Sequence, residues 1–382
     1  MRYVLTQCRV FTGTQIIEEC AVAVNDGQIV SVGPLAEIDS SLPRIMLKNQ
    51  LLVPGFIDTQ VNGGANVLFN EAPSIKSVRA IGEAHRQFGT TGFLPTLISD
   101  TRVKMEAALE AAQQALAEKV PGVLGVHLEG PFLNQERKGV HPEEMIRLPE
   151  EGAVELLASL GSAGKTLVTL APERMPPGFI RQLVDSGVIV AAGHSAASYD
   201  QTRSALDEGL SGFTHLFNAM SPLTSREPGV VGAALEDDSS WCGIIVDNHH
   251  VHPAALRVAI KAKPCGRMML VTDAVHSVGS DQSLFELLGQ KIICEQGRVS
   301  TVEGTLAGSD LDMASAVRNC VEIVGLSLEE SLRMASLYPA EFLGLGDRYG
   351  RIEPGYQASM VLLNDKLEAL ETWIDGESDG RL

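Results

Sequence analysis

The sequence predicts an α/β protein in which a (β/α)8 TIM barrel carries a small β-sandwich domain formed by the N- and C-terminal segments. Three observations support this fold class. Between residues 55 and about 335, eight short apolar runs alternate with amphipathic segments, as expected for a parallel sheet covered by helices. Both ends of the chain carry short strand-like segments instead. Polar residues follow the apolar runs, where the strands of such a barrel converge on one mouth.

The two ends of the chain have the sequence pattern of exposed antiparallel strands. Residues 1–53 alternate apolar and polar side chains, and the Asp26-Gly27 step is typical of a hairpin turn. Short strands with Pro-Gly and Asp-Gly turns return at 350–365 and 369–376. The expected domain limits are therefore 1–53 and 348–382 for the two parts of the sandwich, and 54–347 for the barrel.

The barrel strands are expected at the eight apolar runs, which are 55–63, 92–99, 123–130, 166–173, 188–195, 212–218, 242–250 and 267–274. Helical spacing of apolar residues is clear at 101–119, 198–209 and 252–263. The helix between the sixth and seventh strands has the weakest signal, because "GVVGAALEDDSSW" has little periodicity. Eight repeats favour a closed barrel over an open sheet.

Charge and composition exclude several classes of partner. The 382 residues carry a formal charge of −18, which would repel nucleic acid and anionic membranes. Six scattered cysteines without a Cys-x-x-Cys pair indicate reduced thiols in a cytoplasmic protein. The N-terminus does not read as a signal peptide, and no apolar stretch reaches the roughly 18 residues of a membrane span. We expect a cytoplasmic protein with a small-molecule substrate.

Nine polar residues at the ends of six strands are difficult to explain by packing alone. They are Gln60, Asn62, Glu129, His194, His215, Asn218, His249, His250 and Asp273. One carboxylate and two imidazoles, from Glu129, His194 and His215, have the composition of a catalytic divalent-metal site. Such an ion would make the burial of Glu129 favourable. Asp273 is then either a proton acceptor and donor or the N-cap of the next segment.

Seven motifs carry a resemblance to a known family over essentially the whole chain. They are "LLVPGFIDTQVNG", "VHLEGPFLN…RKGVH", "AAGHSAA", "FTHLFNAMSPLTSREPG", "GIIVDNHHVHP", "LVTDA" and "GTLAGSDLDM". In this order they resemble the N-acetylglucosamine-6-phosphate deacetylases of the amidohydrolase superfamily. The resemblance implies a barrel with a β-sandwich, a homodimer, and a role in amino-sugar catabolism and recycling.

The resemblance also assigns roles to residues of this chain. It implies metal ligands at Glu129, His194 and His215, an acid/base at Asp273, and a carbonyl-polarising group at His141. Implied substrate contacts are Val140, Asn218, Ala219, Arg226, His250, Leu306, Ala307 and Gly308. Arg226 and His250 are the candidates for phosphate and sugar hydroxyls, and one or both would act across the dimer interface.

Two departures from the wider superfamily matter. The first strand carries Gln60-Val61-Asn62 where many members have a His-x-His pair, and neutral amides are poor ligands for a transition metal. One ion per subunit is therefore expected. Zn²⁺ suits the ligands, and Fe²⁺, Co²⁺, Mn²⁺ or Ni²⁺ accept the same set. The bridging lysine that the superfamily carries on the fourth strand is also missing, and Glu129 looks like the residue that takes its place. Glu173 ends that strand, and a structural salt bridge is expected for it.

The implied reaction is hydrolysis of the acetamide of N-acetyl-D-glucosamine 6-phosphate to D-glucosamine 6-phosphate and acetate. A divalent ion would acidify the attacking water, and Asp273 would accept its proton and then protonate the leaving amine. The alternatives are a deacetylase of the C4 epimer, N-acetylgalactosamine 6-phosphate, another amidohydrolase, or a non-catalytic binding barrel. Intact ligands and base argue against the last of these.

Overall fold

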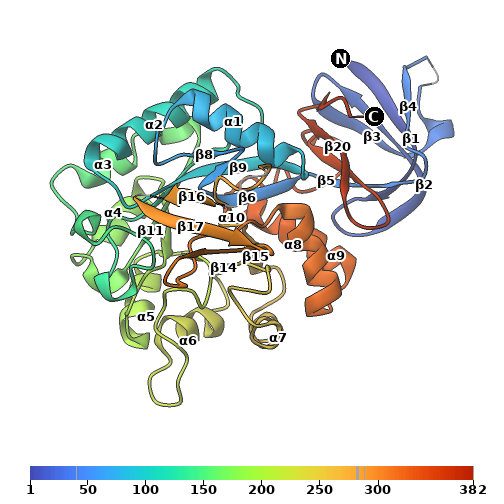
Figure 1. Ribbon diagram of the computed structural model, residues 1–382. Helices are drawn as coiled ribbons and strands as arrows, with labels where there is room; N and C mark the ends of the chain where they lie inside the picture. The colour runs from blue at the N-terminus through green and yellow to red at the C-terminus, as the bar shows by residue number, and fades with distance from the viewer. Residues whose placement is uncertain (40, 281–283, 288, 382) are drawn as a thin grey trace.

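The computed structural model describes residues 1–39, 41–280, 284–287 and 289–381. A large barrel lies beside a smaller β domain that contains both chain termini (Figure 1). Within the described ranges, no helix is long and apolar enough to cross a membrane. All six cysteines are free thiols, as predicted.

The barrel is a parallel eight-stranded sheet with its strands in chain order, which confirms the predicted fold class. Every one of the eight predicted runs forms a strand. The strands are β6 (Phe56–Val61), β9 (Thr90–Ile98), β10 (Gly125–Glu129), β11 (Lys165–Leu170), β12 (Ile189–Ala192), β13 (Gly212–Phe213), β14 (Trp241–Ile244) and β15 (Met268–Leu270).

The first and last barrel strands meet just beyond β15. Val61 and Ala274 form a parallel bridge, and the Asn62 backbone N–H donates to the Ala274 carbonyl at 2.8 Å. The Asp273 N–H donates to the Gln60 carbonyl at 3.0 Å. The seam that closes the barrel is therefore built from residues that the sequence marks as functional.

Helices cover the outside of the barrel (Figure 1). They are α1 (Ile75–Arg86), α2 (Arg102–Ala117), α3 (Ala153–Leu157), α4 (Phe179–Asp185), α5 (Tyr199–Asp207), α6 (Gly229–Glu236), α7 (Pro253–Ala262), α8 (Met313–Asn319), α9 (Leu328–Ala335) and α10 (Leu337–Phe342). Shorter turns are η1 (Leu35–Glu37), η2 (Gln135–Arg137), η3 (Glu143–Met145), η4 (Gly161–Ala163), η5 (Pro172–Arg174) and the π-type η6 (Cys320–Val324).

Local sequence explains where several of these helices begin. Ser198 and Gln201 form a reciprocal capping box at the start of α5. The His252 ring caps α7, because it accepts a hydrogen bond from the Ala254 N–H at 3.1 Å. The weakly periodic helix α6 is present, and it lacks periodicity because all but its last residue are buried.

Both ends of the chain contribute to one eight-stranded, mostly antiparallel sheet beside the barrel. Its strands are β1 (Arg2–Phe11), β2 (Ile16–Asn25), β3 (Gln28–Pro34), β4 (Arg44–Met46), β5 (Leu51–Pro54), β19 (Met360–Leu363), β20 (Ala369–Ile374) and β21 (Glu377–Ser378). The sheet encloses its own apolar cluster, separate from the barrel core. The predicted pairing of the two chain ends is confirmed, and the limits at 53 and 348 stay a prediction.

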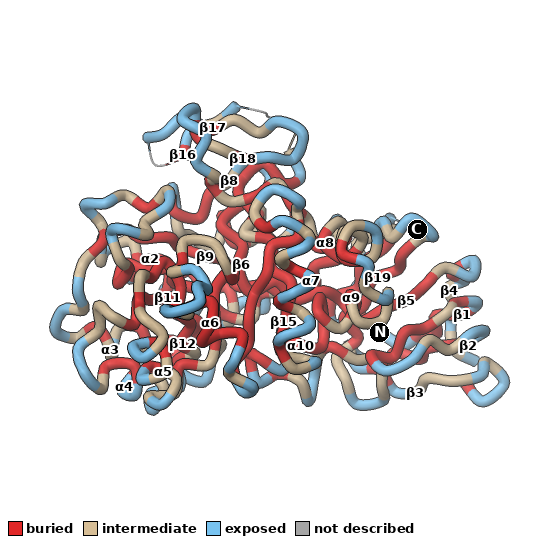
Figure 2. The backbone as a smooth tube through the Cα atoms, turned by 90° about the horizontal axis from the view of Figure 1, so that it is seen from below, coloured by how far each residue is buried: buried red, intermediate tan, exposed pale blue. Residues whose placement is uncertain are grey.

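An additional small sheet, which the sequence analysis did not predict, follows β15. Its antiparallel strands are β16 (Leu284–Leu287), β17 (Gln290–Glu295) and β18 (Arg298–Thr301). They stand out from the barrel in Figure 2, near the short hairpin β7 (Gly63–Gly64) and β8 (Val67–Leu68). The Gln296-Gly297 turn, with positive φ at both residues, is a hairpin signal that the sequence carries.

Trp373 tests the apolar cluster of the terminal sheet. It lies opposite Met360 in the β19–β20 ladder and is 1% exposed. Trp373→Ala should lower the free energy of unfolding by about 3–5 kcal/mol, because it leaves a cavity in that cluster. Urea unfolding followed by circular dichroism measures the change.

Trp373→Phe is the matched control. The indole N–H has no hydrogen-bond partner among the described residues, so phenylalanine removes an unsatisfied donor and keeps most of the ring volume. A cost below about 1 kcal/mol for the alanine variant would contradict the assignment of this residue to the core.

Candidate active site

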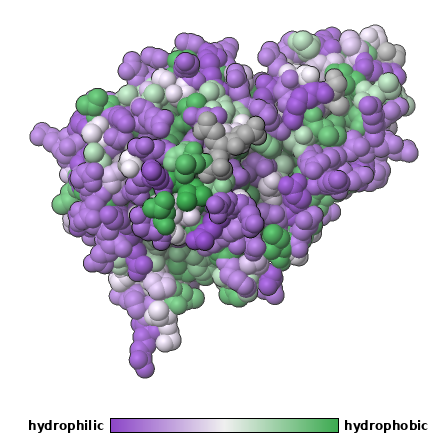
Figure 3. All heavy atoms as spheres, in the orientation of Figure 1, coloured by the Kyte–Doolittle hydropathy of each residue, from purple (hydrophilic) through white to green (hydrophobic). Residues whose placement is uncertain are grey.

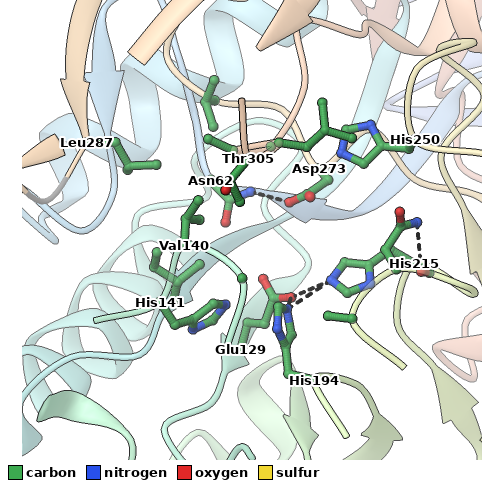
Figure 4. Close-up of a pocket in the computed structure, with 18 of the residues that line it drawn as sticks. Asn62, Glu129, Val140, His141, His194, His215, His250, Asp273, Leu287 and Thr305 are labelled. Carbon is green, nitrogen blue, oxygen red and sulfur yellow. Dashed lines mark hydrogen bonds and ion pairs between the residues drawn. The ribbon is translucent and has the colours of Figure 1, made fainter. Parts of the chain in front are cut away.

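A cavity of about 370 Å³ opens at the C-terminal ends of the barrel strands. It collects residues from widely separated parts of the chain, and all but one of the residues to which the resemblance assigns a role line it. Those that line it are Glu129, Val140, His141, His194, His215, Asn218, Ala219, His250, Asp273, Leu306, Ala307 and Gly308. Figure 4 shows the labelled members of this set pointing into a common space. The exception is Arg226, which lies outside this lining.

Glu129 lies at the centre of the cavity floor, at the end of β10, and is 2% exposed. Its Oε1 is 3.1 Å from His194 Nε2 and 2.9 Å from His215 Nε2, and the two Nε2 atoms are 3.1 Å apart (Figure 4). Three ligand atoms that converge at such spacings fit around one metal ion. The buried Glu/His/His composition therefore suits a divalent cation.

A second histidine competes for the third ligand position. Ligand atoms of Glu129, His141 and His194 also all lie within 4.8 Å of one another. The hydrogen bonds of the rings distinguish the two histidines. The Ser99 backbone N–H donates to His141 Nδ1 at 3.2 Å, so a neutral His141 ring carries its proton on Nε2 and offers no lone pair there.

His194 has the opposite tautomer. Its Nδ1–H donates to the Arg137 carbonyl at 2.8 Å, which leaves the Nε2 lone pair facing Glu129. His215 Nδ1 has no partner among the described residues, so neither tautomer of this ring is excluded. The tautomers thus favour His194 and His215 as the imidazole ligands and His141 as a hydrogen-bond donor.

Electrostatics of the cluster support the same division. Burial alone would raise the pKa of Glu129, but hydrogen bonds and charge from His194 and His215 hold it well below its usual value. Burial lowers the pKa of His141 well below its usual value, and nearby His194 adds to the effect. His141 is therefore a neutral ring at physiological pH, with an N–H to donate.

Asp273 faces this cluster from the barrel seam. Its Oδ1 accepts hydrogen bonds from Asn62 Nδ2 at 2.6 Å and from Gln60 Nε2 at 3.1 Å. Burial, with the charge of Glu129 added, raises the pKa of Asp273 to about 6. No helix begins in residues 274–280, the described segment that directly follows Asp273, so the alternative role as an N-cap is wrong.

Gln60 and Asn62 orient carboxylates in this site. The Gln60 amide donates one hydrogen bond to Glu129 Oε2 and one to Asp273 Oδ1, each at 3.1 Å. The amide therefore links the central carboxylate to the acid/base candidate. The two amides that replace a His-x-His pair thus occupy positions where they donate hydrogen bonds.

The expected substrate-contact residues differ in whether their hydrogen-bonding groups already have partners within the protein. Asn218 donates to the His215 carbonyl at 3.0 Å, and His250 Nδ1 lies 2.6 Å from Asp247 Oδ2. The Ala307 N–H already donates to the Val299 carbonyl at 3.1 Å, so it is not available to a ligand. Arg226 is exposed on the loop between β13 and α6.

Sequence reasoning missed several lining residues, among them Asn70, Glu136, Leu287 and Thr305. Leu287 and Thr305 come with the small sheet β16–β18, which was itself not predicted. It also missed Ser99, whose backbone and hydroxyl fix the His141 ring at 3.2 and 2.8 Å. No motif marks Ser99, because its role depends on a strand end meeting a distant loop.

The expectation of a salt bridge for Glu173 is wrong. In the part of the chain that the structure describes, its carboxylate contacts three hydrogen-bond donors and no cation within ion-pair distance. Among the histidines, His249 lies 3.3 Å from the Gln296 carbonyl, away from the metal cluster. Lys138 pairs with exposed Glu143 at 3.0 Å, as expected for a surface lysine.

Comparison with known proteins identifies the family. The amidohydrolase family model matches residues 51–380, and the NagA composite domain model matches residues 2–52. The chain is 44% identical over 374 residues to an N-acetylgalactosamine-6-phosphate deacetylase of Shewanella sp. (strain ANA-3), covering 97% of this chain and 94% of that protein. It is 34% identical over 380 residues to an N-acetylglucosamine-6-phosphate deacetylase of Haemophilus influenzae, covering 99% of each.

Solved structures agree with these sequence matches. The crystal structure of N-acetylglucosamine-6-phosphate deacetylase from Pasteurella multocida superposes with a TM-score of 0.95 at 35% identity, covering 99% of this chain and 100% of that chain. Family model, curated relatives and structure all extend across the barrel and the terminal sheet. The chain belongs to the amidohydrolase family.

Proposed function

We propose that this chain hydrolyses the acetamide of N-acetyl-D-glucosamine 6-phosphate to D-glucosamine 6-phosphate and acetate. The observation that carries the proposal is the buried convergence of Glu129, His194 and His215, faced by Asp273 across one cavity. Relatives that match over nearly the full chain are named as deacetylases of phosphorylated N-acetylhexosamines. That combination favours an amide hydrolase over a binding barrel.

Glu129, His194 and His215 would hold one divalent metal ion per subunit. Zn²⁺ suits one carboxylate and two imidazoles, and Fe²⁺, Co²⁺, Mn²⁺ and Ni²⁺ accept the same ligands. Such an ion supplies Lewis acidity, which polarises a carbonyl and makes water more acidic. His215 is preferred to His141 as third ligand, because the Ser99 N–H occupies the Nδ1 lone pair of His141.

Asp273 would act as the general base and then the general acid. Its carboxylate takes a proton from the attacking water while a carbon–oxygen bond forms at the acetyl carbonyl. When the carbon–nitrogen bond breaks, the same carboxyl group gives that proton to the leaving amine. Asn62 and Gln60 hold the carboxylate in place throughout.

His141 would stabilise negative charge on the acetyl oxygen. Its tautomer leaves an Nε2–H directed toward the cavity, and its depressed pKa keeps the ring neutral. One well-placed donor of this kind contributes roughly 3–4 kcal/mol to transition-state stabilisation. Around this centre, Val140, Asn218, Ala219, His250, Leu306, Ala307 and Gly308 would surround the sugar.

Arg226 would bind the phosphate group of the substrate held in the site of a second copy of the chain. It is exposed, lies outside the cavity lining of its own chain, and shares its loop with Leu223, which is 56% exposed. The loop between β13 and α6 projects from the barrel at the bottom of Figures 1 and 3. A guanidinium matches phosphate oxygens. We therefore propose a homodimer in which each loop completes the partner's site.

The C4 epimer, N-acetylgalactosamine 6-phosphate, is a second candidate substrate. The 44% identity to the Shewanella relative, which carries that name, favours it. Both epimers present the same acetamide and phosphate to the residues described above. They differ only in the direction of one hydroxyl.

Acetate release from both epimers tests the proposed function. We expect turnover of at least one of them by metal-loaded protein, with the ratio of the two kcat/KM values assigning the preferred sugar. Absence of acetate release from either epimer, in protein shown to contain one metal per chain, would contradict the proposal.

The metal ligands are tested by substitution. His215→Ala should weaken Zn²⁺ binding at least about 100-fold, because it removes a ligand atom, whereas His141→Ala should change it less than about 3-fold. Competition with a chromophoric chelator measures both dissociation constants. The reverse order of effects would assign the third ligand to His141 instead.

Asp273 is tested by substitution and by pH. Asp273→Asn should keep Zn²⁺ and substrate binding but lower kcat at least about 1,000-fold, because an amide accepts no proton. The base must be deprotonated, and its pKa of about 6 is lowered further by a bound cation. The logarithm of kcat/KM should therefore fall with unit slope once the pH drops below this lowered pKa, at a pH under about 6. An active asparagine variant would refute the assignment.

Arg226 is tested by mixing inactive subunits. Arg226→Ala should raise KM, because the phosphate loses its cation, and Asp273→Asn should lower kcat. Co-expressed, the two variants should form mixed dimers in which one site has both intact residues and recovers about half the wild-type activity per dimer. No recovery in a mixed dimer isolated by two affinity tags would place Arg226 in its own subunit's site.

A further inference from the structure

We propose that Glu173 is a positioning residue that fixes the His194 imidazole by tying together the two loops on either side of it. The inference rests on the proposed function, because it takes His194 as a metal ligand. Glu173 lies in η5 (Pro172–Arg174), directly after β11, and is half-buried. Glu173 does not line the cavity, and none of its three hydrogen-bond partners lines it, so we argue its effect through those neighbours.

The carboxylate of Glu173 accepts three hydrogen bonds from two different loops. Oε1 accepts from Asn134 Nδ2 at 2.9 Å and from the Ala196 backbone N–H at 2.7 Å. Oε2 accepts from Ser195 Oγ at 2.7 Å. Asn134 follows β10, which ends in Glu129, while Ser195 and Ala196 directly follow His194. One side chain in the turn after β11 thus joins the loops that follow the two neighbouring strands, β10 and β12.

The contacts continue to both the backbone and the ring of His194. The Asn134 N–H donates to the His194 carbonyl at 3.0 Å, which ties the backbone of the ligand to the β10 loop. The Arg137 N–H donates to the Asn134 carbonyl at 2.9 Å, and this closes the turn. The Arg137 carbonyl then accepts the His194 Nδ1–H at 2.8 Å. Asn134, held by Glu173, therefore anchors the turn that sets the ring's orientation and tautomer.

His194 needs such support because its backbone is strained. Its φ is +49°, in the left-handed region that residues other than glycine seldom occupy. Two hydrogen bonds on the following residues, Ser195 and Ala196, hold the chain on one side of it. The Asn134 N–H donates to the His194 carbonyl and so holds the same turn from the β10 loop. Ser195, Ala196 and Asn134 all donate to the Glu173 carboxylate.

Glu173→Gln is the sharpest single test. Glutamine keeps the size of the side chain but has one accepting oxygen, and its amide would face a donor where Oε2 or Oε1 now accepts. We expect Zn²⁺ affinity, measured by chelator competition, to fall about 10- to 100-fold. The visible absorption bands of the Co²⁺-loaded protein should shift as well. The urea midpoint of the metal-free protein should stay close to that of the control.

Glu208→Gln is the matched control. Glu208 also joins two segments by accepting backbone N–H groups, from Gly178 at 3.1 Å and Arg181 at 3.4 Å, but it touches neither His194 nor its loops. It should leave Zn²⁺ affinity and the Co²⁺ spectrum unchanged. Wild-type Zn²⁺ affinity and Co²⁺ spectrum in Glu173→Gln would overturn the proposal, as would an equal loss in Glu208→Gln.

Asn134→Ala tests whether Glu173 acts on His194 through Asn134. If Glu173 acts through Asn134, the loss of affinity in the double variant should be smaller than the product of the single losses, because both break one connection. Fully independent losses would overturn the proposed route. If Glu173→Gln does not fold, Ser195→Ala replaces it, since it removes the Oε2 contact together with the hydrogen bond that Ser195 Oγ accepts from the Ala197 N–H at 3.1 Å. Unchanged affinity there would overturn the proposal.

The experiment separates this inference from the proposed function. Tight Zn²⁺ binding by the unsubstituted protein without acetate release would contradict the proposed function. The positioning role would still be tested by the Zn²⁺ affinity of Glu173→Gln. Acetate release and Zn²⁺ affinity that are both insensitive to Glu173→Gln would end the positioning role and leave the function intact.

Discussion

The buried carboxylate of Glu129 is the constraint on which the rest of the site depends. A carboxylate that is 2% exposed at the end of a core strand is stable only with partners, and His194, His215 and Gln60 surround it. Each partner needs its own support in turn. His194 relies on the Arg137 carbonyl, and Gln60 on the strand that closes the barrel. A bound cation would satisfy all three ligand atoms at once.

Barrel closure and acid/base chemistry share the same residues. The seam between β6 and the end of β15 uses the backbones of Gln60, Asn62, Asp273 and Ala274, while the side chains of three of them form the Asp273 hydrogen-bond group. Closing the ring therefore brings the amides and the carboxylate to hydrogen-bond distance. Asp273 itself has a left-handed backbone, with φ of +53°, which turns the chain at this point. The backbone hydrogen bonds that close the barrel therefore also place the Asp273 carboxylate.

Sequence reasoning reached the barrel and the group of polar residues at its mouth because both follow periodic rules. Eight apolar runs end in polar residues, and a parallel barrel brings such ends together, so Glu129, His194, His215 and Asp273 were predictable as neighbours. Ser99 and Asp247 were not, because their hydrogen bonds to His141 and His250 arise from loop geometry that no sequence pattern marks. Glu173 was assigned a salt bridge, since pattern alone does not reveal that its partners are an amide, a hydroxyl and a backbone N–H. The sheet β16–β18 shows alternation and a Gln-Gly turn, a signal that was present and missed.

The charge of the cavity lining bears on how the proposed substrate would bind. With neutral histidines, the ionisable lining residues are Glu129, Glu136, Asp273 and Arg137, a formal excess of two negative charges within a protein of −18. A sugar phosphate dianion would be repelled from such a cavity. One divalent ion cancels the local excess, and it does so beside the acetamide rather than the phosphate. Under the proposed function the phosphate needs cations of its own. Arg137 lines the cavity, and Arg226, on a projecting loop outside that lining, is the second cation that we propose another copy of the chain brings to it.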